Sequence, residues 1–64
     1  MQHDNPIAEL DDAIAGREAI IKQLLVARAL DQAFGQGLEA ANAVESRLYA
    51  AGYEQTKRGD WFLL

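Results

Sequence analysis

Residues 38–64, LEAANAVESRLYAAGYEQTKRGDWFLL, decide the fold because their hydrophobic period changes once, near Gly52. Before that glycine the apolar residues recur three and four positions apart, which predicts an amphipathic helix over about residues 38–51. Gly52 suits the left-handed position that follows a helix. After it, two β-prone runs around a glycine-containing turn predict a β-hairpin over about residues 53–64, with Arg58-Gly59 or Gly59-Asp60 as its loop.

The chain upstream of this stretch has a strong helix start and an ambiguous middle. Asn5 is a good N-cap, and Pro6 suits the first helical position. One broad apolar stripe follows, formed by Ile7, Leu10, Ile14, Ile21, Leu24 and Leu25. A second apolar group lies on the opposite side of the same helical projection, formed by Val26, Leu30, Ala33 and Phe34.

Two interpretations fit this double pattern. Either one long helix over about residues 6–34 is apolar on two faces, or a break near residues 27–30 separates two helices. Both end at Gly35-Gln36-Gly37, where two glycines interrupt the helix. The sequence therefore predicts a mainly α protein of the α+β class: two to three antiparallel helices, then a short C-terminal β-hairpin or extended tail, in one small domain over residues 1–64.

The amino-acid composition argues against most catalytic and metal-binding functions. The 64 residues carry a formal net charge of −4 and no cysteine, so disulfides and thiolate metal sites are excluded. A nucleophile with its base needs Ser, Thr or Cys beside His or Lys, and the chain holds one Ser, Ser46, one Thr, Thr56, and one His, His3. We expect no enzyme, no cofactor and no resident metal. A free amino terminus followed by His3 would chelate Cu²⁺ or Ni²⁺ in a test tube.

The order of elements from Leu24 to Leu64 is helix, glycine-containing turn, helix and hairpin, which resembles the end of a winged helix-turn-helix domain. The resemblance covers architecture and no sequence motif. It implies a recognition helix over residues 38–51 and a wing at Lys57-Arg58. That helix carries Glu39, Glu45 and a single arginine, whereas a helix that reads DNA brings several cationic donors. Nucleic acid is therefore an unlikely partner on charge.

The aromatic tail is the most informative surface candidate. Four of the five aromatic residues lie within residues 49–64. On a strand, Trp61 and Leu63 face one way while Phe62 and Leu64 face the other. Either all four pack into the core, or one face stays outside as an anchor for a partner. The predicted partner-binding residues are Tyr49, Tyr53, Lys57, Arg58, Trp61 and Phe62.

The predicted helices also carry more apolar surface than a single pair of helices in so short a chain can bury. Small scaffolds without disulfides or metals often oligomerise for this reason. We therefore expect a homodimer. The predicted self-association residues are Ile14, Ile21, Leu24, Leu25, Leu30 and Phe34.

These features together predict a small acidic, non-catalytic module that binds a partner protein as a regulator, inhibitor or adaptor, of the kind that phages use against nucleic-acid-handling machinery. The alternative is a winged-helix-like, nucleic-acid-binding transcriptional regulator. The start of the chain has no signal-peptide pattern, and no apolar run approaches the roughly 20 residues of a membrane helix. The expected compartment is the cytoplasm.

Overall fold

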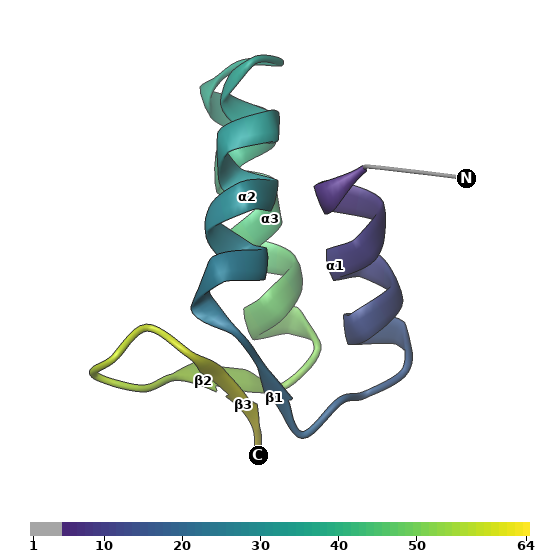
Figure 1. Ribbon diagram of the computed structural model, residues 1–64, viewed down its shortest axis with the longest axis vertical. Helices are drawn as coiled ribbons and strands as arrows, with labels where there is room; N and C mark the ends of the chain where they lie inside the picture. The colour runs from purple at the N-terminus through teal and green to yellow at the C-terminus, as the bar shows by residue number, and fades with distance from the viewer. Residues whose placement is uncertain (1–4) are drawn as a thin grey trace.

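Figure 1 shows the computed structural model of the protein, which describes residues 5–64. The chain forms α1 (Pro6–Ala15), β1 (Ile20–Ile21), α2 (Gln23–Phe34), α3 (Leu38–Ala50), β2 (Tyr53–Gln55) and β3 (Trp61–Leu63). The predicted mainly α class with a C-terminal hairpin is confirmed. His3, considered above as a chelating residue, lies outside the described residues.

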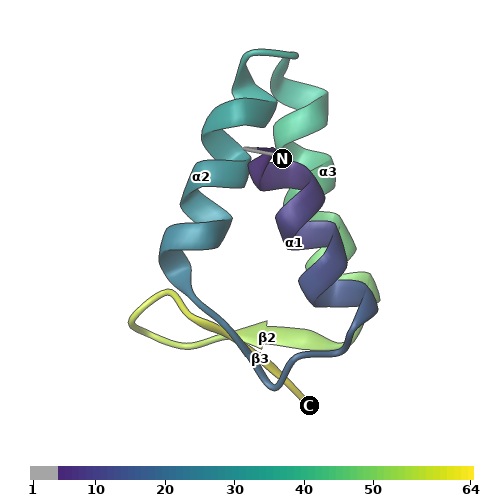
Figure 2. The same ribbon diagram turned by 45° about the vertical axis from the view of Figure 1, so that its right-hand side comes forward.

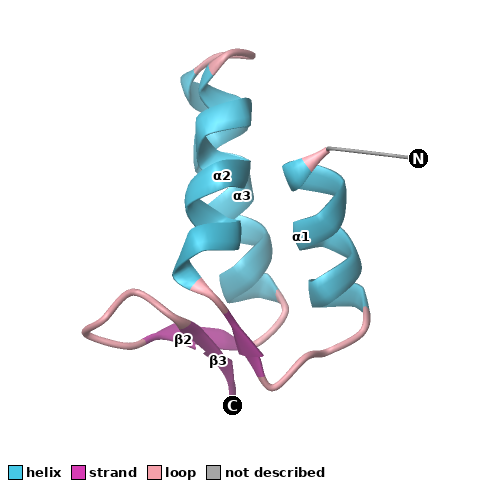
Figure 3. Ribbon diagram, in the orientation of Figure 1, coloured by secondary structure: helices cyan, strands magenta, loops and turns pink. Residues whose placement is uncertain are grey.

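The three strands form one antiparallel sheet in the order β1-β3-β2, which lies across one end of the helices (Figure 3). Trp61 in the central strand pairs with Ile21 on one side and with Gln55 on the other. An isolated two-stranded hairpin is marginal in water. Here β1 supplies a third strand, and the helices cover the inner side of the sheet.

The predicted N-terminal helix is wrong in both of its forms. The break lies at residues 16–22, and α2 runs without interruption through residues 27–30. After α1 the N–H groups of Arg17 and Glu18 turn back onto carbonyls of the last helical turn, with Arg17 in the left-handed conformation at φ 53°. The apolar residues Ile20 and Ile21 then pair with β3. Strand pairing, a contact across about 40 residues of sequence, is what ends the helical stripe early.

The starts of α1 and α2 are stabilised in different ways. Asn5 is the N-cap of α1, and its side-chain oxygen accepts a hydrogen bond from the Ala8 N–H at 3.2 Å. Lys22, the N-cap of α2, supplies no such side-chain bond. Instead the Asp60 carboxylate, from the end of the β-hairpin loop, accepts from the Gln23 N–H at 3.0 Å. The second helix therefore begins where the hairpin meets it.

The hydrophobic core lies between the helices and the inner side of the sheet. Its largest side chains are Trp61 and Tyr53, which are each 1% exposed. The Tyr53 hydroxyl donates to the Glu18 carbonyl at 2.8 Å and so ties the α1–β1 connection to β2. The buried set is Leu10, Ala13, Ile21, Val26, Ala29, Ala33, Ala41, Val44, Leu48, Tyr53 and Trp61.

Candidate docking face

The helix pair α2–α3 has one side that α1 covers. The two helices run in opposite directions and are joined by residues 35–37 (Figure 2). Gln32 of α2 accepts a hydrogen bond from the Ile7 N–H of α1 at 2.9 Å. Arg47 of α3 lies 3.3 Å from the Asp11 carboxylate of α1. These two contacts mark the side of each helix that faces α1.

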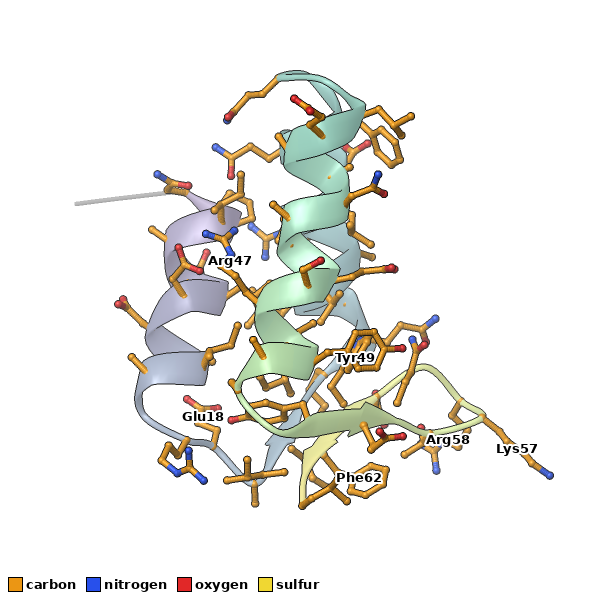
Figure 4. All side chains as sticks on the ribbon, turned by 180° about the vertical axis from the view of Figure 1, so that it is seen from behind. Glu18, Arg47, Tyr49, Lys57, Arg58 and Phe62 are labelled. Atoms are coloured by element: carbon orange, nitrogen blue, oxygen red, sulfur yellow. The ribbon has the colours of Figure 1, made fainter. Side chains whose placement is uncertain are left out.

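The opposite side of the same pair is bare. Phe34 follows Gln32 by two residues, and Tyr49 follows Arg47 by two, so each aromatic points roughly 160° away from the residue that contacts α1. Figure 4 shows Arg47 and Tyr49 on opposite sides of α3. Leu38 falls on the same line of α3 as Tyr49, because eleven residues make about three turns.

We call this side the open face and define it by Leu30, Phe34, Leu38 and Tyr49. The exposed fractions are 59% for Phe34, 67% for Leu38 and 55% for Tyr49, while Leu30 is partly buried against the core. Tyr49 also packs edge-on against Trp61, with the ring centroids 4.9 Å apart. The open face therefore exposes apolar side chains at both ends of α3, with Asn42 between Leu38 and Tyr49, and its Tyr49 ring is held by a buried neighbour.

The loop between β2 and β3 projects beneath the open face. We call residues 56–60 the wing. In Figure 1 the wing extends to the side of α2–α3 away from α1, and its tip carries the exposed cations Lys57 and Arg58 (labelled in Figure 4). The open face and the wing together make a corner, with Tyr49 close to its inner angle.

Thr56 and Asp60 face each other across the wing, so residues 57–59 form its three-residue tip, one residue longer than either predicted loop. The Thr56 N–H donates to the Asp60 carbonyl at 2.7 Å, and the Gly59 N–H donates to the Thr56 carbonyl at 3.0 Å. Gly59 has φ +101°, which is the conformation that closes such loops. The Arg58-Gly59-Asp60 tripeptide is thus a structural turn, and its carboxylate is engaged with Gln23.

Charge is distributed unevenly along the open face. At the end where residues 35–37 join the helices, Asp31 and Glu39 flank it, and both are exposed. At the sheet end the flanking charges are Lys57 and Arg58 of the wing. Glu45, also exposed, lies one turn before Tyr49 on the same side of α3, near the middle of the open face. The open face therefore has an acidic end, a basic end and one carboxylate between them.

A second, smaller apolar surface covers the outer side of the sheet. The register places Ile20 and Phe62 opposite each other, and Leu64 follows on the same side of the strand. Ile20 and Leu64 are exposed, and Phe62 is partly exposed. We call these three residues the sheet face. The predicted alternation of Trp61 and Leu63 against Phe62 and Leu64 is confirmed.

The structure divides the predicted partner-binding residues. Tyr49 lies at the sheet end of the open face, Lys57 and Arg58 lie at the outer tip of the wing with their side chains directed away from Tyr49 (Figure 4), and Phe62 lies on the sheet face. The assignment of Tyr53 and Trp61 to an exposed anchor is wrong, because both rings fill the core beneath the sheet.

The predicted self-association residues are divided as well. Leu30 and Phe34 lie on the open face. Ile21 is buried in the core, so its assignment to an exposed surface is wrong, and Ile14 and Leu25 are partly buried against the core. Leu24 is 70% exposed but lies about 80° around α2 from Phe34, apart from the open face.

Leu38 belongs to the open face but is not among the predicted partner-binding or self-association residues. Its spacing from Ala41 fits an apolar stripe, yet it lies about 90° from the centre of the buried residues Ala41, Val44 and Leu48. A helical projection centred on those three residues is the signal that identifies Leu38 as exposed.

Residues 5–64 show neither a metal-binding cluster nor a membrane-spanning helix. No group of three or more His, Asp or Glu side chains in that range is placed to hold a metal ion. Within the same range, no helix combines the length and apolar character needed to cross a membrane. Ser46 is exposed on α3, and the Thr56 hydroxyl oxygen accepts a hydrogen bond from the Asp60 N–H inside the wing.

Comparison with known protein families, with curated proteins and with solved structures finds no match to this chain.

Proposed function

We propose that the protein is a small acidic, non-catalytic module that acts by docking its open face against another protein surface, as a regulator, inhibitor or adaptor. The observation that carries the proposal is the exposure of Phe34, Leu38 and Tyr49 together on one side of α2–α3. Contiguous apolar surface rimmed by polar groups is typical of protein interaction sites. We propose the cytoplasm as the place of action.

The composition of the corner supports a protein partner. Aromatic residues and arginine are enriched at the energetic centres of protein interfaces, and the corner has Tyr49 with Arg58 on the adjoining wing, while Phe34 lies at the turn end of the open face. Tyr49 is held in place by its contact with the buried Trp61 ring, so little side-chain freedom is lost when a partner binds. The cations of the wing would guide an acidic patch of a partner toward the corner.

The test uses two leucines of equal exposure. Leu38→Asp places a charge on the open face, while Leu24→Asp places the same charge on α2 outside it. We expect Leu38→Asp to abolish binding of the partner to immobilised protein and Leu24→Asp to leave it unchanged, with helicity by circular dichroism equal in both. Equal binding by the two variants would overturn the proposal.

The second candidate is a nucleic-acid-binding regulator. This candidate is favoured by the order of the elements: two helices joined by a short turn are followed by a wing with Lys57 and Arg58 at its tip. Charge opposes it, because the solvent side of α3 carries Glu39 and Glu45 while Arg47 is turned toward Asp11. Binding to duplex DNA that falls steeply with salt and is lost in Lys57→Glu/Arg58→Glu would support this candidate. No retention at low salt would eliminate it.

A further inference from the structure

We propose that the partner that the open face fits is a second copy of this chain. The two copies pack antiparallel across a twofold axis, so that the α2–α3 turn of each lies in the corner between Tyr49 and the wing of the other. The inference rests on the proposed function and names the occupant of that same face.

Shape favours this arrangement. α2 has 12 residues and α3 has 13, so each is about 18–20 Å long. Phe34 and Leu38 lie at the turn end of the open face, and Tyr49 lies at the sheet end. A twofold axis across the middle of the face pairs unlike ends, so that the apolar turn end of one copy covers the apolar corner of the other. Such an interface uses the same residues twice and closes at two copies.

Charge selects the direction of packing and the identity of the partner. In the antiparallel arrangement, Asp31 and Glu39 of one copy come beside Lys57 and Arg58 of the other. A parallel arrangement would bring acidic end to acidic end and basic end to basic end, and like charges across an interface are unfavourable. The two ends of the open face are therefore complementary when one copy is reversed, while Glu45, near the middle of the face, lies close to the same residue of the other copy in either direction.

The area that a dimer interface would bury can be compared with the total accessible surface of the chain. A stable interface of standard size buries about 800 Å² on each partner. The chain exposes 4231 Å² in total, so a dimer would cover roughly a fifth of it. The open face carries three of the large exposed apolar side chains among residues 5–64, Phe34, Leu38 and Tyr49, with one charge group at each end.

The experiment is a charge exchange measured by sedimentation equilibrium. The wild-type chain is expected at twice its mass of 7.0 kDa. Lys57→Glu/Arg58→Glu and Asp31→Lys/Glu39→Lys should each weaken self-association at least about tenfold, because each replaces attraction by repulsion. An equimolar mixture of the two variants should associate one to one, since the exchanged charges attract again. The mixed pair has the same total charge as the wild-type dimer.

The control separates local from global charge. Arg17→Glu/Arg28→Glu changes the formal net charge from −4 to −8, as Lys57→Glu/Arg58→Glu does, but at positions away from the open face. It should remain dimeric. If it dissociates as readily as the wing variant, or if mixing fails to restore association, the antiparallel arrangement is wrong.

The outcomes also distinguish this inference from the proposed function. A wild-type chain that stays monomeric at millimolar concentration overturns the second-copy inference, and the proposed function then stands only if Leu38→Asp still abolishes binding to a different protein. A dimer that survives Leu38→Asp uses another surface, such as the sheet face, and also overturns the inference. If the chain is monomeric and Leu38→Asp binds another protein as well as the wild type does, both the second-copy inference and the proposed function are overturned.

Discussion

The two sides of the α2–α3 pair both carry apolar side chains but have opposite surroundings. On one side α1 brings Leu10 into the core and adds polar contacts through Gln32 and Arg47. On the other side Phe34 and Leu38 face solvent, and only the wing approaches. The covered side owes its burial to residues that lie earlier in the chain. The open side has no such segment within residues 5–64.

The exposed apolar residues of the open side are therefore a surface feature and not a packing defect. The covered side uses small residues, Ala29, Ala33 and Ala41, that let the helices approach closely. The open side carries larger side chains that project beyond the helices. Stability should therefore depend on the covered side, and binding on the open side.

Leu10→Ala tests the covered side. Leu10 is fully buried between α1 and the helix pair, and truncating such a leucine removes buried apolar surface and leaves a cavity. We expect a loss of about 2–5 kcal/mol in the free energy of unfolding, measured by urea denaturation. Leu38→Ala, the same change on the open face, should change stability by no more than about 0.5 kcal/mol when measured on dissociated protein. Equal losses would remove the distinction between the two sides.

Gly59→Ala tests the wing, which lies at the sheet end of the open face. A Cβ at this position would lie 2.7 Å from the Gln23 side chain, and the residue has φ +101°. Strain of this kind costs about 1–3 kcal/mol. Thermal unfolding should show the loss, and Lys57→Ala in the same loop should show almost none. A wild-type melting temperature for Gly59→Ala would contradict the observed loop.

Asp60→Ala tests the link between the wing and α2. It removes the acceptor for the Gln23 N–H and leaves the start of α2 without a side-chain cap. Loss of a cap costs about 1 kcal/mol. Amide hydrogen exchange at Gln23 should accelerate in Asp60→Ala, while Asp60→Asn keeps an oxygen acceptor and should retain most of the protection. Unchanged exchange in Asp60→Ala would show that the cap is not formed.

Arg17→Gly gives the smallest expected effect and has the opposite sign. Arg17 holds a left-handed conformation that costs a non-glycine residue about 1–2 kcal/mol. Glycine relieves this strain but makes the unfolded chain more flexible, which offsets about 0.5–1 kcal/mol. We expect a net gain of a few tenths of a kcal/mol up to about 1 kcal/mol in denaturant unfolding. A loss of stability would place the strain elsewhere.

Local signals in the sequence determined the boundaries that local chemistry controls. Asn5 and Pro6 mark the start of α1, and Gly52 marks the end of α3, because capping depends on residues within one turn of the helix end. The alternation of Trp61 and Phe62 across β3 also followed from the chain alone, since neighbouring residues on a strand point to opposite sides.

Tertiary structure decided the rest, because the relevant contacts join residues far apart in the chain. Ile20 and Ile21 left the helical pattern to pair with β3, and Asp60 capped a helix that begins 37 residues earlier. Helical periodicity shows that α2 and α3 each have apolar residues on more than one side, but it does not show which side α1 will occupy. Only the tertiary structure distinguishes the buried Trp61 from the exposed Phe34, because burial depends on which other elements pack against each side chain.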